Sequence, residues 1–190
     1  MTGSNQATLR LATIKDSAKL AELHVAAWKE TYRGIVPDEM LASLSVERRT
    51  TAWHKILGEP AGSSSTVTHV MTVGPDFAGF ASSGPQRSAE IEQIGYDGEI
   101  SAVYVRRSFQ KRGLGRWLMA AAAASLQDRG FEAASLWVLQ DNLQARQFYE
   151  HLAGQIVGRR EDVRETAVLV EVAFGWLSLS CLSASDVRIK

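Results

Sequence analysis

Apolar and polar positions alternate over several short runs of the chain, which is the period of a β-strand. TLRLAT at residues 8–13 alternates, and EISAVYV at residues 99–105 is β-branched and largely apolar, as expected of a central strand. The same signals predict further strands at residues 66–73, 77–83, 133–139, 155–160 and 166–176.

Apolar positions spaced for a helix lie between these strands. One segment repeats them every four residues, at Leu114, Leu118, Ala122 and Leu126. The alanines between these positions favour a helix, and Gly130 is placed to end it in a left-handed conformation. Three further helical regions are predicted, after residues 16–17, across residues 38–57 in one or two pieces, and from 142 to about 152.

The order β-α-α-β-β-β-α-β-α-β-β predicts a single mixed α/β (α+β) domain over residues 1–176. Residues 177–190 show no clear pattern, and we expect a loosely ordered tail there. The apolar run VAFGWLSLSCL at residues 172–182 suggests a homodimer that uses the C-terminal region.

Composition narrows the class of protein. The 190 residues are 45% hydrophobic and 22% charged, which is typical of one soluble globular domain. Because 21 basic residues balance 21 acidic ones, a general nucleic-acid binder is not expected, although a local basic site remains open.

Cysteine and histidine usage argues against disulfide and metal sites. Cys181 is the only cysteine, so an internal disulfide framework is excluded, and the four histidines lack metal-ligand spacing. No apolar run reaches the roughly 18 residues that span a bilayer, and the N-terminus lacks the apolar segment of a signal peptide. We therefore expect a cytoplasmic protein that needs neither a metal nor a membrane.

The sequence QKRGLG at residues 110–115 joins the strand at 99–105 to the alanine-rich helix. The first amides of that helix lack internal partners, and the helix dipole adds positive charge there. Gly113 and Gly115 leave the backbone bare, so a ligand can approach it closely. Full positive charges are added by Lys111, Arg112 and Arg116. This combination favours a phosphate-binding turn.

Two common nucleotide-binding motifs do not fit this turn. Neither glycine is followed by Lys-Ser or Lys-Thr, as a Walker motif requires, and Leu118 stands where a dinucleotide fingerprint needs its third glycine. Two other interpretations stay open. One is a glycine turn beside arginines on a solvated face, and the other is a nucleic-acid site that also uses Arg106 and Arg107, which the neutral overall charge disfavours.

QKRGLG resembles the Q/R-x-x-G-x-G/A signature of the GNAT superfamily of acetyl-CoA-dependent N-acetyltransferases. DNLQARQFYEHLAG at residues 141–154 resembles the Asn-x-x-Ala-x-x-Phe-Tyr segment of the same family. The resemblance covers the order of elements from Thr8 to Trp176, with one departure at Gln155, where the family commonly has Phe. It implies helices on both faces of a mixed sheet whose strands four and five, at residues 99–105 and 133–139, splay apart.

The resemblance also implies acetyl-CoA as the co-substrate. Its pyrophosphate would be held by Gln110, Lys111, Arg112, Gly113, Leu114, Gly115 and Arg116. Its pantetheine arm would lie along Val103, Tyr104 and Val105, with Asn142 nearby. The arm would pair with the strand backbone like an added strand.

The implied reaction is direct transfer of the acetyl group to a primary amine. Tyr149 would protonate the leaving thiolate, and Glu99 or a water chain would remove a proton from the amine. Trp28 and Tyr32, four residues apart on a predicted helix, would border the acceptor site, although core packing is the competing interpretation for Trp28. The acceptor could be a small metabolite, a drug-like amine, or the N-terminus or a lysine of a peptide.

A second class of function fits the same cofactor site. The domain could bind acetyl-CoA without catalysis, as a sensor or an assembly module. The two hypotheses differ at Tyr149 and at the acceptor cleft, so a turnover assay separates them.

Overall fold

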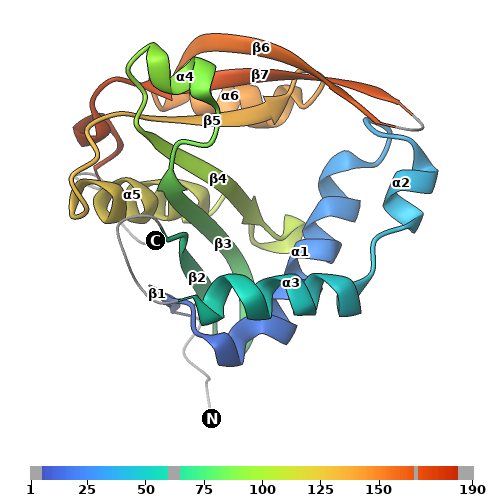
Figure 1. Ribbon diagram of the computed structural model, residues 1–190. Helices are drawn as coiled ribbons and strands as arrows, with labels where there is room; N and C mark the ends of the chain where they lie inside the picture. The colour runs from blue at the N-terminus through green and yellow to red at the C-terminus, as the bar shows by residue number, and fades with distance from the viewer. Residues whose placement is uncertain (1–5, 60–64, 165–166, 184–190) are drawn as a thin grey trace.

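The computed structural model describes residues 6–59, 65–164 and 167–183. Seven strands form one sheet in the order β1-β2-β3-β4-β5-β7-β6, and only β4 and β5 are parallel neighbours (Figure 1). The strands are β1 (Ala7–Leu11), β2 (Val67–Val73), β3 (Asp76–Pro85), β4 (Gly98–Val105), β5 (Ala134–Leu139), β6 (Gln155–Val163) and β7 (Val168–Trp176). The predicted mixed sheet is confirmed.

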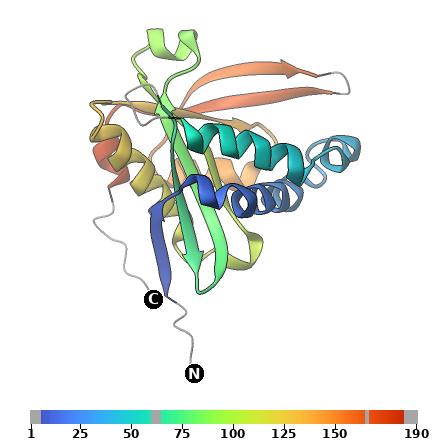
Figure 2. The same ribbon diagram turned by 60° about the horizontal axis from the view of Figure 1, so that its bottom comes forward.

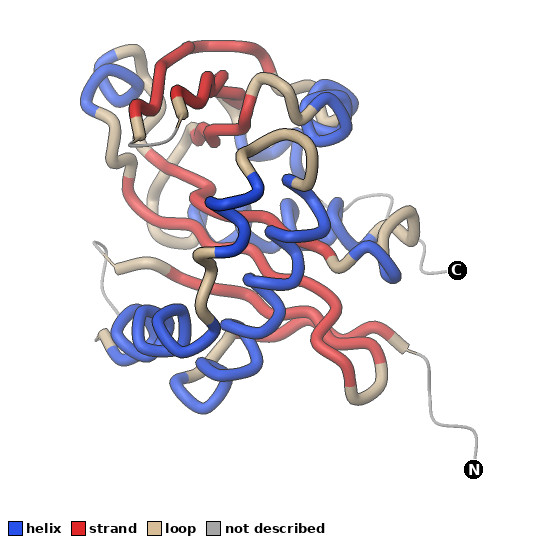
Figure 3. Tube along the Cα trace, turned by 90° about the vertical axis from the view of Figure 1, so that its right-hand side faces the viewer, coloured by secondary structure: helices blue, strands red, loops and turns tan. Residues whose placement is uncertain are grey.

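Helices cover both faces of this sheet, as predicted (Figures 1 and 2). The α-helices are α1 (Ser17–Tyr32), α2 (Asp38–Ala42), α3 (Val46–Gly58), α4 (Ala89–Gln93), α5 (Leu114–Gln127) and α6 (Leu143–His151). Three short 3-10 helices are η1 (Ile14–Asp16), η2 (Arg107–Phe109) and η3 (Leu179–Leu182). Figure 3 shows the helices packed around the strands. Among the described residues, no helix is both long enough and apolar enough to cross a membrane.

Two hydrophobic clusters hold the layers together. One lies between the sheet and α5, where the predicted stripe of Leu114, Leu118, Ala122 and Leu126 is buried. The other lies between the sheet and the pair α1 and α3, around Phe80. The four-residue period therefore identified the buried face of α5 correctly, because helical residues four apart share a face.

The segment at residues 84–98, for which no helix or strand was predicted, holds a short helix. It contains α4, and Ile91 and Tyr96 are buried against Ala133 and Ala173. With only five residues, α4 is too short for its apolar period to be recognised from sequence.

The chain after β7 also packs on the domain. Leu179 and Leu182 of η3 are buried in the cluster beneath α5, while residues 184–190 lie outside the described residues. Val172, Phe174 and Trp176 are buried in the same cluster. The apolar run at 172–182 is thus largely used within one chain, so it no longer argues for a homodimer.

Strands β4 and β5 pair only at the point where both begin. Gly98 pairs with Ala134 and Glu99 with Ser135, and no further residues of the two strands are in register. The Gly98 amide also donates to the Ala133 carbonyl at 3.0 Å. Beyond this point the strands diverge, which confirms the expected splay and opens a gap in the middle of the sheet.

Candidate active site

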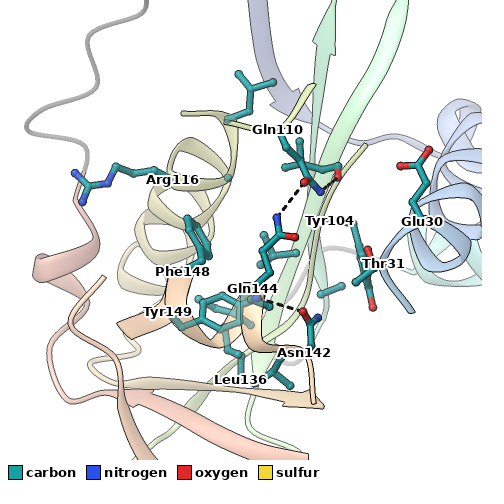
Figure 4. A pocket seen from close by; sticks show the side chains of 18 of the residues that line it. Glu30, Thr31, Tyr104, Gln110, Arg116, Leu136, Asn142, Gln144, Phe148 and Tyr149 are labelled. Atoms are coloured by element: carbon teal, nitrogen blue, oxygen red, sulfur yellow. Dashed lines mark hydrogen bonds between the residues drawn. The ribbon is translucent and has the colours of Figure 1, made fainter. Parts of the chain in front are cut away.

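A cavity of about 460 Å³ occupies the gap between β4 and β5. Its walls come from the end of α1, from β4 and β5, from the first turn of α5 and from α6 (Figure 4). This volume lies within the range of small-molecule sites. Five elements distant in sequence therefore meet at one hollow.

The first turn of α5 forms the basic end of the cavity. Gly113 caps this helix with a φ of 79°, a left-handed conformation that glycine adopts without steric cost. The amides that follow it point out of the helix without internal partners. An anion would meet bare donors and the positive end of the helix dipole there.

The basic side chains around this turn differ in where they lie. Lys111 and Arg116 line the cavity, although the Arg116 side chain extends away from its deep end (Figure 4). Arg112 does not line it, because its guanidinium lies over the Phe109 ring at 5.7 Å from the centroid. Arg107, which the site prediction left out, lines the cavity as well.

Two glutamines connect the α5 turn with α6 across the mouth of the cavity. The Gln110 amide group donates to the Val105 carbonyl at 3.0 Å, and the Gln144 amide group donates to Gln110 Oε1 at 3.1 Å (Figure 4). Gln110 was expected to lie here. Gln144 was missed, although it follows the predicted cap Asn142 by only two residues.

Asn142 begins α6, as the sequence predicted. Its side-chain oxygen accepts from the Ala145 amide at 3.2 Å, which is the usual contact of a helix N-cap. The residue is buried and lines the cavity. One side chain thus starts the helix and faces the hollow.

Tyr149 lies two turns further along α6 and also lines the cavity. Its ring packs on Phe174 at 5.7 Å and Trp176 at 6.2 Å between centroids. Burial raises the pKa of this phenol, and the nearby Tyr32 raises it further. A phenol with its ordinary pKa of about 10 is already protonated at neutral pH, and this hydroxyl stays so.

Gly115 brings α5 and α6 close together. A Cβ atom at this position would lie 3.2 Å from the Phe148 ring, which itself lines the cavity. The missing side chain therefore serves helix packing as well as backbone exposure. Phe148 was missed as a site residue because a helical phenylalanine usually belongs to the core.

Glu99 does not occupy the place expected of a base. It is buried at the closed end of the splay and is absent from the cavity wall. Arg87 holds its carboxylate with two hydrogen bonds of 2.7 and 2.6 Å. The carboxylate is thus paired with Arg87 and does not line the cavity between β4 and β5.

The two aromatic residues of α1 divide between core and cavity. Tyr32 lines the cavity, and its hydroxyl lies 3.2 Å from that of Tyr104 on β4. Trp28 does not line it but packs on the Tyr32 ring at 4.8 Å between centroids. Tyr104 was expected to contribute only through its backbone, so its hydroxyl is an addition to the site.

Glu30 was missed and joins α1 to the loop after β4. It lines the cavity, accepts from Arg106 Nε at 3.1 Å and accepts from the Arg107 amide at 2.8 Å. The local sequence could not predict these contacts, because Glu30 is 76 and 77 residues away from Arg106 and Arg107.

Solved structures share the fold. The PaiA N-acetyltransferase from Thermoplasma acidophilum, in complex with coenzyme A, superposes with a TM-score of 0.69 at 17% identity, over 87% of this chain and 98% of that one. The structure of yncA from Salmonella typhimurium with acetyl-CoA has a TM-score of 0.65 at 19% identity, over 98% and 99% of the two chains. At these identities the likeness concerns the fold alone.

Similarity in sequence shows the family as well as the fold. The protein named "Uncharacterized N-acetyltransferase YuaI" of Bacillus subtilis (strain 168) is 36% identical over 177 residues, which are 92% of this chain and 95% of that protein. A sequence model described as "Acetyltransferase (GNAT) family" matches residues 19–154, which include the splayed strands, the turn before α5 and all of α6. With the sheet, the cavity and both sequence motifs in agreement, the chain belongs to the GNAT acetyltransferase family.

Proposed function

We propose that this protein transfers the acetyl group of acetyl-CoA to a primary amine by direct attack of the amine on the thioester. The observation that carries the proposal is the cavity between β4 and β5, which runs from the bare amides of α5 to the phenol of Tyr149. The shape suits a ligand with an anionic end and a long thiol arm. The two solved relatives described above hold coenzyme A or acetyl-CoA.

The residues present fit such a ligand. The amides of residues 113–116 and the Lys111 ammonium would hold the pyrophosphate, with Arg112 and Gln110 at its border. The edge of β4 that faces β5 has no strand partner beyond Glu99, so Val103, Tyr104 and Val105 can offer backbone groups to the arm. The Gln110 side chain, which is now hydrogen-bonded to the Val105 carbonyl, would have to turn away to free that carbonyl for the arm. Asn142 would lie beside the arm.

Acetyl-CoA supplies an activated carbonyl, and the protein must then handle charge and protons. In this proposal, the backbone amide near Val103 stabilises the negative charge that develops on the carbonyl oxygen. Tyr149, which like any phenol with a pKa of about 10 or above is protonated at neutral pH, donates a proton to the departing thiolate. Tyr32 borders the acceptor, while Trp28 supports Tyr32 from behind.

A turnover assay over a panel of primary amines tests the proposal. Release of free thiol from acetyl-CoA that depends on an amine, with the acetylated amine found by mass spectrometry, supports it. Calorimetry on the same protein measures acetyl-CoA binding. Tight binding without turnover on any amine would instead support a sensor or an assembly module.

A further inference from the structure

We propose that the paired hydroxyls of Tyr104 and Tyr32 carry a proton from the acceptor amine out of the cavity toward Glu171. This inference rests on the proposed acetyl transfer and identifies the path that its proton takes. An amine with a pKa of about 10 is mostly protonated at neutral pH, so some group must take its proton before or during attack.

The hydroxyls of Tyr104 and Tyr32 are the first two groups of the path. Tyr104 belongs to β4, next to Val103, and Tyr32 is the last residue of α1. Both line the cavity, and their oxygens are 3.2 Å apart, so either can donate to the other. A phenol that gives one proton while receiving another never becomes a phenolate. The path therefore works although burial raises the pKa of both tyrosines.

Aromatic packing holds Tyr104 in position. Its ring lies 5.5 Å from that of Phe80 and 5.3 Å from that of His24, measured between centroids. Burial, with a smaller effect of the Arg49 charge, lowers the pKa of His24 to about 3, so this imidazole is neutral and a weak base. Besides His24, the titratable groups that act on the pair are Tyr149 from α6 and Glu171 from β7.

Glu171 is the carboxylate toward which the path leads. It lies on β7 opposite Leu139 of β5, and Leu139 belongs to the apolar cluster that Tyr32 packs against. Its negative charge contributes to the raised pKa of Tyr32. Arg160, whose side chain is exposed, donates to it at 2.7 Å, so the carboxylate lies next to solvent.

Two other carboxylates, Glu99 and Glu30, are held by basic side chains, as Glu171 is by Arg160. Glu99 is bound by Arg87 outside the cavity, and Glu30 is occupied by Arg106 Nε and the Arg107 amide. Neither is among the charges that act on Tyr32 or Tyr104, whereas Glu171 acts on Tyr32.

Each bond in the step is balanced. An N–H bond of the ammonium breaks and its proton joins the Tyr104 oxygen, while the Tyr104 proton passes to Tyr32. The Tyr32 proton then passes through water to the Glu171 carboxylate. The neutral amine keeps its electron pair for attack, both tyrosines end as they began, and Glu171 returns its proton to water.

The test uses the full chain and an amine that the parent acetylates. The variants are Tyr104→Phe, Tyr32→Phe and the double variant. The matched control is Tyr96→Phe, because Tyr96 is buried outside the cavity. We expect each single variant to lower kcat/KM about 10²-fold at pH 7, with acetyl-CoA binding unchanged. The double variant should be no worse than the singles, because both residues serve one path.

Two readouts separate a proton path from a structural role. The loss should shrink as the pH rises toward the pKa of the amine, and it should be smaller for an acceptor whose pKa lies below the assay pH. Glu171→Gln should show the same pH-dependent loss. A loss that is equal at every pH and for both acceptors, or no loss at all, would overturn the inference.

Folding and function are controlled separately. If Tyr104→Phe fails to fold, as judged by circular dichroism, the pH profiles of Tyr32→Phe and Glu171→Gln decide the matter. The parent is assayed first, and a parent without turnover on any amine contradicts the proposed function rather than the proton path.

Discussion

Tyr149 combines a structural and a chemical property in one ring. Its packing on Phe174 and Trp176 excludes water, and the same burial raises the pKa of the phenol. The side chain is thus held protonated at the wall of the cavity. Gly113 makes a comparable double contribution, since its left-handed conformation starts α5 and leaves open space above the first amides.

Replacing Tyr149 with Phe should keep the packing and remove only the proton. We expect turnover to fall by roughly 10²–10⁴-fold, with the dissociation constant of acetyl-CoA nearly unchanged. Steady-state kinetics and calorimetry measure the two quantities. The loss should shrink for a thioester whose thiol is more acidic, and equal turnover of variant and parent would remove Tyr149 from the mechanism.

A side chain at Gly113 tests the phosphate-binding turn. A Cβ there meets nothing within 4 Å, but the φ of +79° strains most residues, and a β-branched one such as Val most of all. Asn tolerates this conformation, so Gly113→Asn should fold and yet weaken acetyl-CoA binding by about tenfold or more, because its side chain covers the bare amides.

Gly130→Asn is the matched control for that variant. Gly130 has a φ of +87° and open space, but it lies at the far end of α5. Calorimetry should show unchanged affinity for Gly130→Asn. If Gly113→Asn also binds acetyl-CoA as tightly as the parent, the turn does not hold the phosphates.

The strand pair β4 and β5 converts a continuous sheet into a site. Its closed end depends on close approach of the two backbones, and its open end forms the cavity. A larger side chain at the closed end should therefore lower the stability of the fold, whatever its effect on catalysis. Gly98 is the residue at which this can be tested.

Gly98→Ala should destabilise the protein by about 1–3 kcal/mol, since overpacking between backbones is relieved only by their movement. Its Cβ would lie 2.9 Å from the Ala133 carbonyl and 3.3 Å from the Leu126 side chain. Denaturant unfolding measures the change. The control is Gly84→Ala, whose Cβ would make only ordinary contacts from 3.4 Å outward. Equal stability of the two variants would contradict this account of the closed end.

The whole molecule is a sheet between two apolar layers, and one of these layers contains a buried histidine. His24 lies under Trp53, Phe80 and Tyr104, where burial lowers its pKa to about 3. The unfolded chain, with a histidine pKa of about 6.5, binds a proton there that the folded protein excludes. Acid should therefore favour the unfolded state.

The free energy of unfolding should fall as the pH drops below about 6.5, with a slope of at most about 1.4 kcal/mol per pH unit from this residue. Urea unfolding between pH 7 and pH 4.5 measures it. This range lies above the window of Asp16, whose pKa Arg10 and the Thr13 backbone lower from 3.8 to about 2. His24→Phe should flatten the slope. An unchanged slope in His24→Phe would contradict the buried neutral imidazole.

Local patterns were enough to predict most elements of the fold. The stripe from Leu114 to Leu126 set the buried face of α5, and Asn142 marked the start of α6. QKRGLG located the turn at the mouth of the cavity. These signals are readable because helix period, capping and glycine conformation depend on residues within a few positions of each other.

Side-chain partners across the molecule could not be predicted in this way. Glu99 sat at a plausible place along its strand, yet Arg87 binds it outside the cavity. Tyr32 and Tyr104 meet across 72 positions of sequence, and Leu182 packs under α5 although its segment shows no period. Such contacts depend on how helices and strands pack in three dimensions. The one-dimensional order of residues therefore located the glycine turn before α5, and the packing of distant elements determined which acids and phenols lie beside it in the cavity wall.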